Sequence, residues 1–334
     1  MVDKSLISIV ITFYTLDRFK DIIELLNSIK NQIYSNIEII LVAERSRELY
    51  ENIKAYLLEE LTLNAKLVFN DGEQGASAGR NLGIKEANGD IIAFVDDDTV
   101  LFPDWAEQLI KTYQDESIIG VAGSCDPLWE DEYMDWFPQE LYWILGCTGW
   151  SEWTEKDEIR NGAGANLSFR RGNLEDCKFL TDLGPKRHED NSWAQGLAED
   201  AELSIRIQRE TGKPIIYNPK VKLKHKVYKY RLSLKYITER SYQVGCSRSM
   251  LKKLYTQSNK STTLLSPEYN LMKRIFTRLF PDILKGFFKN PAIAWRKLWV
   301  TVIALFFVAL GYFAYSVSNL TGHRKDILSA KEKV

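Results

Sequence analysis

The sequence predicts an α/β protein with a doubly wound, mainly parallel sheet and a C-terminal helical, membrane-associated extension. Short β-branched apolar runs alternate with helix-periodic segments over the N-terminal third, the pattern of a parallel sheet covered on both faces. Three consecutive aspartates directly follow the last of these runs. Near the C-terminus, residues 298–322 carry no charge, and this run exceeds the ~20 residues needed to cross a bilayer.

The N-terminal elements are predicted from hydrophobic periodicity. Strands are expected in the apolar runs at Ile7–Phe13, 38–42, 66–69 and Ile91–Val95. Helices are expected where apolar residues recur every three or four positions, at 17–30, 47–60 and 78–87. Ligands of such sheets bind at the carboxyl ends of the strands. We therefore expect Tyr14, Glu44 and the three aspartates to line one pocket.

The remaining chain is predicted to add shorter elements and a helical C-terminal part. Helices are expected at 104–113, Glu199–Thr211, 231–254 and 271–288, with Gly212 ending the second of these. Strands are expected at 118–122, 214–217 and 221–225, and a glycine-bearing loop at 161–170 leads into another. The predicted organisation is an α/β domain at 1–228, a basic amphipathic region at 229–297, a transmembrane or membrane-embedded helix at 298–322 and a basic tail at 323–334.

Composition excludes two classes of function. The chain has 44 basic and 45 acidic residues, so its formal net charge of −1 lacks the basic surplus of nucleic-acid-binding domains, and no nucleic-acid partner is expected. Its four cysteines form no Cys-x-x-Cys pair, which argues against a zinc or redox motif and favours a reducing compartment.

The aspartate triplet Asp96-Asp97-Asp98 is the strongest candidate site. Adjacent carboxylates repel one another unless a cation lies among them. Oxygen ligands suit Mg²⁺ or Mn²⁺, and such an ion can also bind the phosphates of a nucleotide. A solvated acidic loop is the alternative, but the preceding apolar strand would fix these side chains in place.

Two further segments carry candidate functional residues. The small-residue loop 75–79 allows a ligand to approach the backbone, and Arg80 after it offers a guanidinium to a phosphate or a base carbonyl. Glu199 and Asp200 begin an amphipathic helix. Carboxylates in a first helical turn commonly serve the helix dipole, whereas the functional alternative is a general base.

These blocks, in this order, resemble the family-2 glycosyltransferases, which have the GT-A fold. The resemblance covers residues 5–225 and rests on SIVITFY, ASAGRNLGIKEANGDIIAFVDDDT and AEDAELSIRIQRETGKPIIYNPKVKLKH. It implies that residues 1–228 are a GT-A catalytic domain. By position it also implies that Thr12, Tyr14, Glu44 and Arg80 bind the nucleotide-sugar donor. The family usually has aspartate where this sequence has Glu44.

The resemblance also assigns the catalytic residues. Asp96 and Asp98 match the family's DxD motif, with Asp96 and Asp97 on the donor and Asp98 as a ligand of Mn²⁺ or Mg²⁺. His225 matches a position where several members place a further metal ligand, and Asp200 matches the catalytic base. This arrangement implies inversion at the anomeric carbon. Because the Gln-x-x-Arg-Trp motif of processive synthases is absent, we expect one sugar per event.

The aromatic-rich segment 133–150 bears on the acceptor. It resembles that of archaeal enzymes acting on dolichyl-phosphate-linked sugars, such as the glucosyl-dolichyl-phosphate glucuronosyltransferases. This implies UDP-glucuronate or a similar UDP-sugar as donor and a lipid-linked saccharide as acceptor. The segment is interpreted as a shallow lipid-contacting element or, alternatively, as a packed core insertion. The remaining alternatives are a transferase for another glycolipid or polysaccharide, a nucleotidyltransferase and a non-catalytic membrane-bound nucleotide-sugar-binding protein.

The C-terminal region predicts a location at the cell membrane. Residues 273–297 carry seven basic side chains and one acidic side chain, interleaved with large apolar residues. Such a segment is attracted to anionic lipid, and the positive-inside rule places the catalytic domain in the cytoplasm. The apolar run at 298–322 is expected to span the membrane, with a surface or re-entrant helix and a buried core helix as alternatives.

Overall fold

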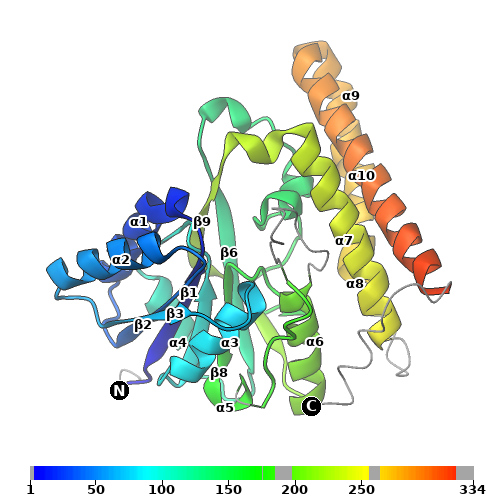
Figure 1. Cartoon of the computed structure of the whole chain (residues 1–334). Coiled ribbons are helices and arrows are strands. Elements are labelled where there is room, and N and C mark those ends of the chain that lie inside the picture. Colours follow the sequence, from blue (N-terminus) through cyan, green and yellow to red (C-terminus); the bar gives the residue numbers. More distant parts are fainter. Residues whose placement is uncertain (1–3, 175, 185–197, 256–263, 321–334) are drawn as a thin grey trace. The chain divides into compact units, whose positions relative to one another are not determined.

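The computed structural model describes residues 4–174, 176–184, 198–255 and 264–320, and the predicted tail at 323–334 lies outside this part. Two compact units make up the chain (Figure 1). The first comprises residues 1–128, 153–194 and 199–226, and the second comprises 129–152, 195–198 and 227–334. Each unit has its own buried apolar clusters, so each is described separately.

The first unit is built on one mixed sheet. Its strands are β1 (Ile7–Phe13), β2 (Ile37–Glu44), β3 (Ala65–Asn70), β4 (Ile91–Val95), β5 (Thr99–Leu101), β6 (Gly120–Trp129), β7 (Glu158–Ile159), β8 (Asn166–Arg170) and β9 (Ile215–Val227). Its helices are η1 (Leu16–Arg18), α1 (Phe19–Lys30), α2 (Arg47–Glu59), α3 (Ala76–Glu86), α4 (Trp105–Tyr113), α5 (Arg171–Leu174) and α6 (Glu199–Thr211).

The strand order confirms the predicted α/β class. It runs β3-β2-β1-β4-β8-β6-β9-β5, and β7 pairs with β9. β3, β2, β1 and β4 are mutually parallel, with the chain order reversing beside β1, as in doubly wound sheets. β8 runs antiparallel to β4 and to β6, and β9 runs antiparallel to β5 and β7. The four strands predicted in the N-terminal third, β1 to β4, therefore form the parallel part of the sheet.

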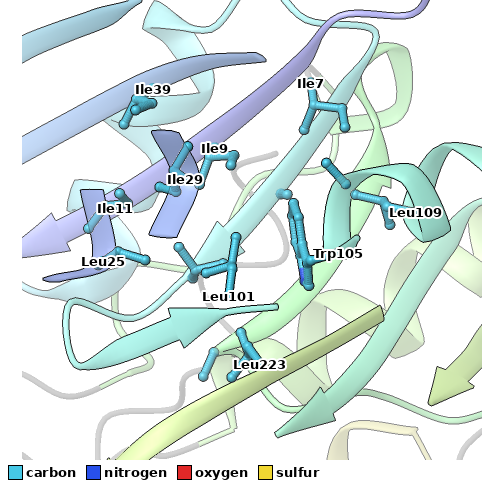
Figure 2. Packing of buried hydrophobic residues seen from close by; sticks show 14 of the residues in the cluster. Ile7, Ile9, Ile11, Leu25, Ile29, Ile39, Leu101, Trp105, Leu109 and Leu223 are labelled. Carbon is cyan, nitrogen blue, oxygen red and sulfur yellow. The ribbon is translucent and has the colours of Figure 1, made fainter. Parts of the chain in front are cut away.

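Alternating side chains of the parallel strands pack into two cores. Ile9 of β1 belongs to a cluster with Leu25 of α1 and Trp105 of α4, shown in Figure 2. Val10, its neighbour, belongs to a second cluster with Ile84 of α3. This period of two is what a strand buried on both faces requires. It explains why the strands are continuous apolar runs and places α1 and α3 on opposite faces.

Some predicted boundaries in the first unit are wrong. The segments 214–217 and 221–225 form a single strand, β9, because pairing with β7 at its start and β5 near its end holds both parts in one sheet. β6 continues to Trp129, well beyond the predicted end at residue 122. β5 was not predicted at all, since three residues carry too little pattern. The predicted stop of α6 is confirmed, with Gly212 at φ +66°.

The second unit is helical. It contains η2 (Glu132–Met134), η3 (Gln139–Leu145), η4 (Lys229–Leu232), α7 (Leu234–Tyr255), α8 (Ser266–Arg274), the π-helical turn η6 (Ile275–Leu279), α9 (Phe280–Lys289) and α10 (Pro291–Leu320). The aromatic segment 133–150 is largely packed within this unit, as expected of a core insertion. Its Phe137, Leu141 and Ile144 are buried against Ile237 of α7 and Val300 of α10, although Tyr133 stays exposed.

Helix α10 has the length and composition of a membrane span. Residues Pro291–Val317 have a mean hydropathy of 2.1, and among the described residues this is the one helix that meets both criteria. Length and composition do not by themselves distinguish a helix that crosses a bilayer from one that lies on it.

Candidate active site

The candidate site lies in the first unit, at the carboxyl ends of β1, β2 and β4. Asp96, Asp97 and Asp98 leave the end of β4 in a turn, and β5 begins directly after them. β5 pairs with β9 so that Thr99 lies opposite His225. This register brings a histidine from late in the chain beside the aspartate triplet.

Asp96, Asp98 and His225 form a compact cluster of potential metal ligands. One ligand atom from each lies within 4.8 Å of the others. His225 Nε2 is 3.1 Å from Asp98 Oδ1 and 4.0 Å from Asp96 Oδ2. Asp98 and His225 are buried, whereas the side chain of Asp96 is 38% exposed. The cluster therefore presents one open ligand beside two fixed ones.

The chemistry of this donor set fits a divalent cation. Two carboxylates and one imidazole nitrogen suit Mn²⁺, which accepts nitrogen as well as oxygen ligands, better than Mg²⁺, which prefers oxygen alone. The three side chains come from two places in the fold, the turn after β4 and strand β9. The residues present therefore fit a divalent cation.

The guanidinium of Arg18 lies beside the cluster of Asp96, Asp98 and His225. Arg18 Nη1 is 3.2 Å from Asp98 Oδ2 and 3.2 Å from Asp21 Oδ2. Asp97 is held next to these groups, and burial followed by the charge of Asp98 raises its pKa well above the usual value, against the opposing effect of Arg18. Arg18 was not among the residues predicted from the sequence. Its only signal was its place just after the first strand, where a ligand-facing loop is expected.

Arg80 of α3 connects the metal-ligand cluster to α6. Its Nη2 is 3.2 Å from Asp96 Oδ1, and its Nη1 is 3.0 Å from Glu199 Oε1. Burial alone would lower the pKa of the guanidinium, but the surrounding charges of Asp96, Glu199 and Asp200 raise it. Arg80 is therefore a buried permanent cation among three carboxylates. Arg80 was predicted to bind the donor, and its ion pair with Glu199 was not predicted.

Asp200 lies beside this arginine. Its Oδ2 accepts a hydrogen bond of 3.1 Å from Gly164 N–H, and its Oδ1 accepts one of 2.7 Å from Ala201 N–H. A Cβ on Gly164 would lie 3.2 Å from Arg80 Nη2 and 3.5 Å from Asp200 Oδ2. Both side chains thus meet at one glycine. Asp200 is half-buried, so its carboxylate is fixed yet reachable.

The other three predicted donor residues lie along β1 and at the end of β2. Thr12 points to the α3 face, where a Cβ on Gly79 would be 3.0 Å from its Cγ2. Tyr14 follows β1 directly and is half-buried. Glu44 is buried, and its Oε2 accepts a hydrogen bond of 2.8 Å from Gly75 N–H. Glu44 thereby holds the start of α3, and a direct contact of these residues with the donor stays a prediction.

The chain is similar to known glycosyltransferases. The profile of the family described as Glycosyl transferase family 2 matches residues 8–174. Glucosyl-dolichyl phosphate glucuronosyltransferase of Haloferax volcanii is 28% identical over 319 residues, which cover 94% of this chain and 96% of that protein.

Two solved structures share the fold. The mannosyltransferase PcManGT from Pyrobaculum calidifontis, in complex with GDP-Man and Mn²⁺, has a TM-score of 0.61 at 15% identity, covering 94% of this chain and 89% of its own. Residues 1–349 of TarS from S. aureus, in complex with UDP-GlcNAc, give a TM-score of 0.53 at 15% identity, covering 96% and 94%. The chain therefore has the GT-A fold and belongs to glycosyl transferase family 2, a family of sugar-transferring enzymes.

Proposed function

We propose that the protein is an inverting, metal-dependent glycosyltransferase that moves one sugar from a UDP-sugar to a lipid-linked saccharide. The observation that carries this proposal is the position of Asp200. Its carboxylate lies beside Arg80, and Arg80 binds Asp96 of the metal-ligand cluster. Arg80 thereby holds the proposed base for the acceptor close to the proposed site of the donor diphosphate.

Each side chain has a proposed task in the transfer. Asp96, Asp98 and His225 would hold Mn²⁺ or Mg²⁺, which would neutralise charge on the leaving diphosphate. Asp200 takes the proton of the acceptor hydroxyl as the acceptor oxygen forms its bond to the anomeric carbon. The bond from that carbon to the diphosphate oxygen breaks, and its electron pair leaves with UDP. Attack opposite the leaving group inverts the anomeric centre.

The identity of the donor and acceptor is proposed from the archaeal relative. That protein is named for transfer of glucuronate to glucosyl-dolichyl phosphate, and the similarity extends over nearly the whole of both chains. UDP-glucuronate is therefore the first donor to test, and a saccharide on dolichyl or polyprenyl phosphate the first acceptor. An acceptor at a membrane also suits the apolar helix α10 and the basic residues before it, which favour membrane lipids as partners. Because the cytoplasmic leaflet is the anionic one, these basic residues also favour a cytoplasmic catalytic unit.

Metal-dependent release of UDP tests this proposal. We expect UDP release from UDP-glucuronate to require Mn²⁺ or Mg²⁺ and to rise when a glucosyl-linked polyprenyl phosphate is added. Asp98→Ala should abolish both activities, because the metal site is lost. Asp200→Asn should lower transfer at least about 1,000-fold, while UDP plus Mn²⁺ still raises its melting temperature. Equal transfer by the wild type and both variants would refute the assignment.

A further inference from the structure

The exposed side of α10 is one continuous apolar stripe. Its members recur every three or four positions, so they lie on a single helical face about 33 Å long. The stripe consists of Trp295, Trp299, Val302, Phe306, Leu310, Phe313 and Val317, all exposed in the structure. The rings of Trp295 and Trp299 stack at its start, with 6.5 Å between their centroids.

Another side of α10 is covered by α7, which runs parallel to it in the same unit (Figure 1). The two backbones nearly touch. A Cβ on Gly245 would lie 2.1 Å from the carbonyl oxygen of Val308, and one on Gly311 would lie 2.0 Å from that of Tyr242. One helical turn further on, Ser249 Oγ is 2.8 Å from Ser316 Oγ. Helix α7 therefore accompanies the second half of α10.

This companion helix carries charges at the level of the apolar run. Glu239 is exposed and lies about one turn before Tyr242, which contacts Gly311. Arg248 directly precedes Ser249 and forms an ion pair with Glu268 of α8. If α10 crossed a bilayer with α7 attached, Glu239 would lie at hydrocarbon depth, where ionised side chains are strongly disfavoured, and Arg248 would lie near the edge of the hydrocarbon. The packing of α7 therefore argues against a spanning orientation.

Basic side chains adjoin the start of the stripe. Lys285 and Lys289 of α9 and Arg296 of α10 are exposed, as is the apolar side chain of Phe288 among them. The link between the two helices is direct, because the rings of Phe287 and Trp295 meet edge to face at 5.3 Å. Exposed apolar rings flanked by lysine and arginine match the boundary between acyl chains and anionic headgroups.

We propose that α10 lies along the surface of an anionic lipid bilayer, with its stripe in the acyl boundary, and does not cross the membrane. This inference rests on the membrane association in the proposed function and replaces the spanning helix predicted from sequence. It requires that the chain end on the same side of the membrane as it begins. The face toward α7 stays within the protein, and lipid contacts only the stripe.

The location of the two chain ends tests the orientation without any substitution. The full chain is given one epitope tag at each end, and protease is added to sealed membrane vesicles of one known orientation. We expect both tags to be cut together or protected together. Protection of one tag and loss of the other would show a crossing helix and overturn the proposal.

Vesicle binding tests the stripe itself. We expect the full chain to bind vesicles that contain phosphatidylglycerol more tightly than vesicles of phosphatidylcholine alone. The double variant Phe306→Ser, Phe313→Ser should lose at least about tenfold in binding. The matched control Leu58→Ser, Leu61→Ser, which alters two exposed leucines at the end of α2 and just beyond it, should bind like the wild type.

The outcomes separate this proposal from the catalytic one. Equal binding by the stripe variant and the wild type, or no preference for phosphatidylglycerol, would overturn the surface orientation. Metal-dependent UDP release measured in detergent does not depend on the stripe and should be the same for both double variants. A chain that binds vesicles through the stripe but never releases UDP would refute the proposed function alone.

Discussion

Arg80 and Glu199 form a buried ion pair between α3 and α6, with 3.0 Å between Nη1 and Oε1. The second nitrogen of the same guanidinium binds Asp96, so one arginine links the end of β4 to the helix that carries Asp200. Its planar fork suits two carboxylates at fixed positions, which a lysine cannot serve equally. The arginine thereby connects the metal-ligand cluster to the proposed base.

Removal of this arginine should destabilise the protein strongly. Arg80→Met removes the cation that lies 3.0 Å from the buried carboxylate of Glu199, and we expect the free energy of unfolding to fall by about 3 kcal/mol. Urea denaturation measures this loss. Lys85→Met is the matched control, because Lys85 is an exposed cation on the same helix and its loss should change the free energy by less than about 0.5 kcal/mol. Similar losses in the two variants would contradict a structural role for the ion pair.

His225 should set the choice of metal. Because an imidazole ligand favours Mn²⁺ and carboxylates suit Mg²⁺, His225→Asp should shift the preference toward Mg²⁺. The measurement is the concentration of each metal that gives half-maximal UDP release, and we expect the ratio of the Mg²⁺ to the Mn²⁺ value to fall at least about tenfold. Lys224→Asp adds a carboxylate at the neighbouring position, on the opposite face of β9, and should leave the ratio unchanged. An unchanged ratio in His225→Asp would exclude the histidine as a ligand.

Gly164 should be needed for activity more than for stability. The methyl group of Gly164→Ala would lie 3.2 Å from Arg80 Nη2, closer than ordinary contacts, and would displace the arginine or Asp200. We expect the kcat of sugar transfer to fall about tenfold, since a small displacement of a positioned base is costly. In Gly172→Ala the methyl group meets no atom within 4 Å, and kcat should not change. Equal kcat values for the two alanine variants would show that the close contact at Gly164 is unimportant.

Local patterns predicted the first half of the fold well. β1 and β4 have the predicted bounds because their side chains are buried on both faces, which leaves an unbroken apolar run in the sequence. β5 depends on pairing with residues of β9 that lie more than a hundred positions away, and the continuity of β9 depends on this pairing and on that with β7. No local pattern records either pairing.

In the candidate site, too, local patterns predicted some features, whereas others depend on contacts between distant parts of the chain. The aspartate triplet was visible because consecutive residues at a strand end form it. The contact of His225 with Asp98 depends on the β5–β9 register, and that of Arg80 with Glu199 joins residues 119 positions apart. Similarity to a family supplied candidates for these positions, but which side chain each one contacts followed only from the packing of the sheet and helices. Arg18 had no motif to mark it.

Glu38 should make the stability of the first unit depend on pH. Burial alone would raise the pKa of this β2 carboxylate, but hydrogen bonds from Ser8 Oγ, Asn88 N–H and Gly89 N–H lower it below its usual value. A carboxylate with a lowered pKa in the folded state stabilises the protein above the pKa of the unfolded chain, and this stability is lost as the pH falls through the folded-state pKa.

The test compares the wild type with Glu38→Gln. At pH 7 we expect the variant to be less stable by about 1 kcal/mol, since the bonds from Ser8, Asn88 and Gly89 are to a charged acceptor. The difference should shrink as the pH falls below about 4.3, the ordinary pKa of glutamate. Urea denaturation at several pH values measures it. If the difference in free energy of unfolding between the wild type and Glu38→Gln stays constant from pH 7 to below about pH 4.3, the charge of Glu38 has no part in stability.

Gly245 should be a position where the packing of α7 against α10 tolerates little added volume. A methyl group there would lie 2.1 Å from the carbonyl oxygen of Val308, and a backbone atom cannot rotate away as a side chain can. The helices would have to separate, so Gly245→Ala should lower the free energy of unfolding by about 1–3 kcal/mol and weaken the hydrogen bond between Ser249 and Ser316.

Gly286→Ala in α9 is the matched control, because its methyl group would meet only Ala294, at an ordinary 3.5 Å. That control should be neutral or more stable, since alanine favours a helix by about 1 kcal/mol over glycine. Urea denaturation should therefore show a lower free energy of unfolding for Gly245→Ala and an equal or higher one for Gly286→Ala. A gain in stability for both variants would mean that the two helices are not packed backbone to backbone.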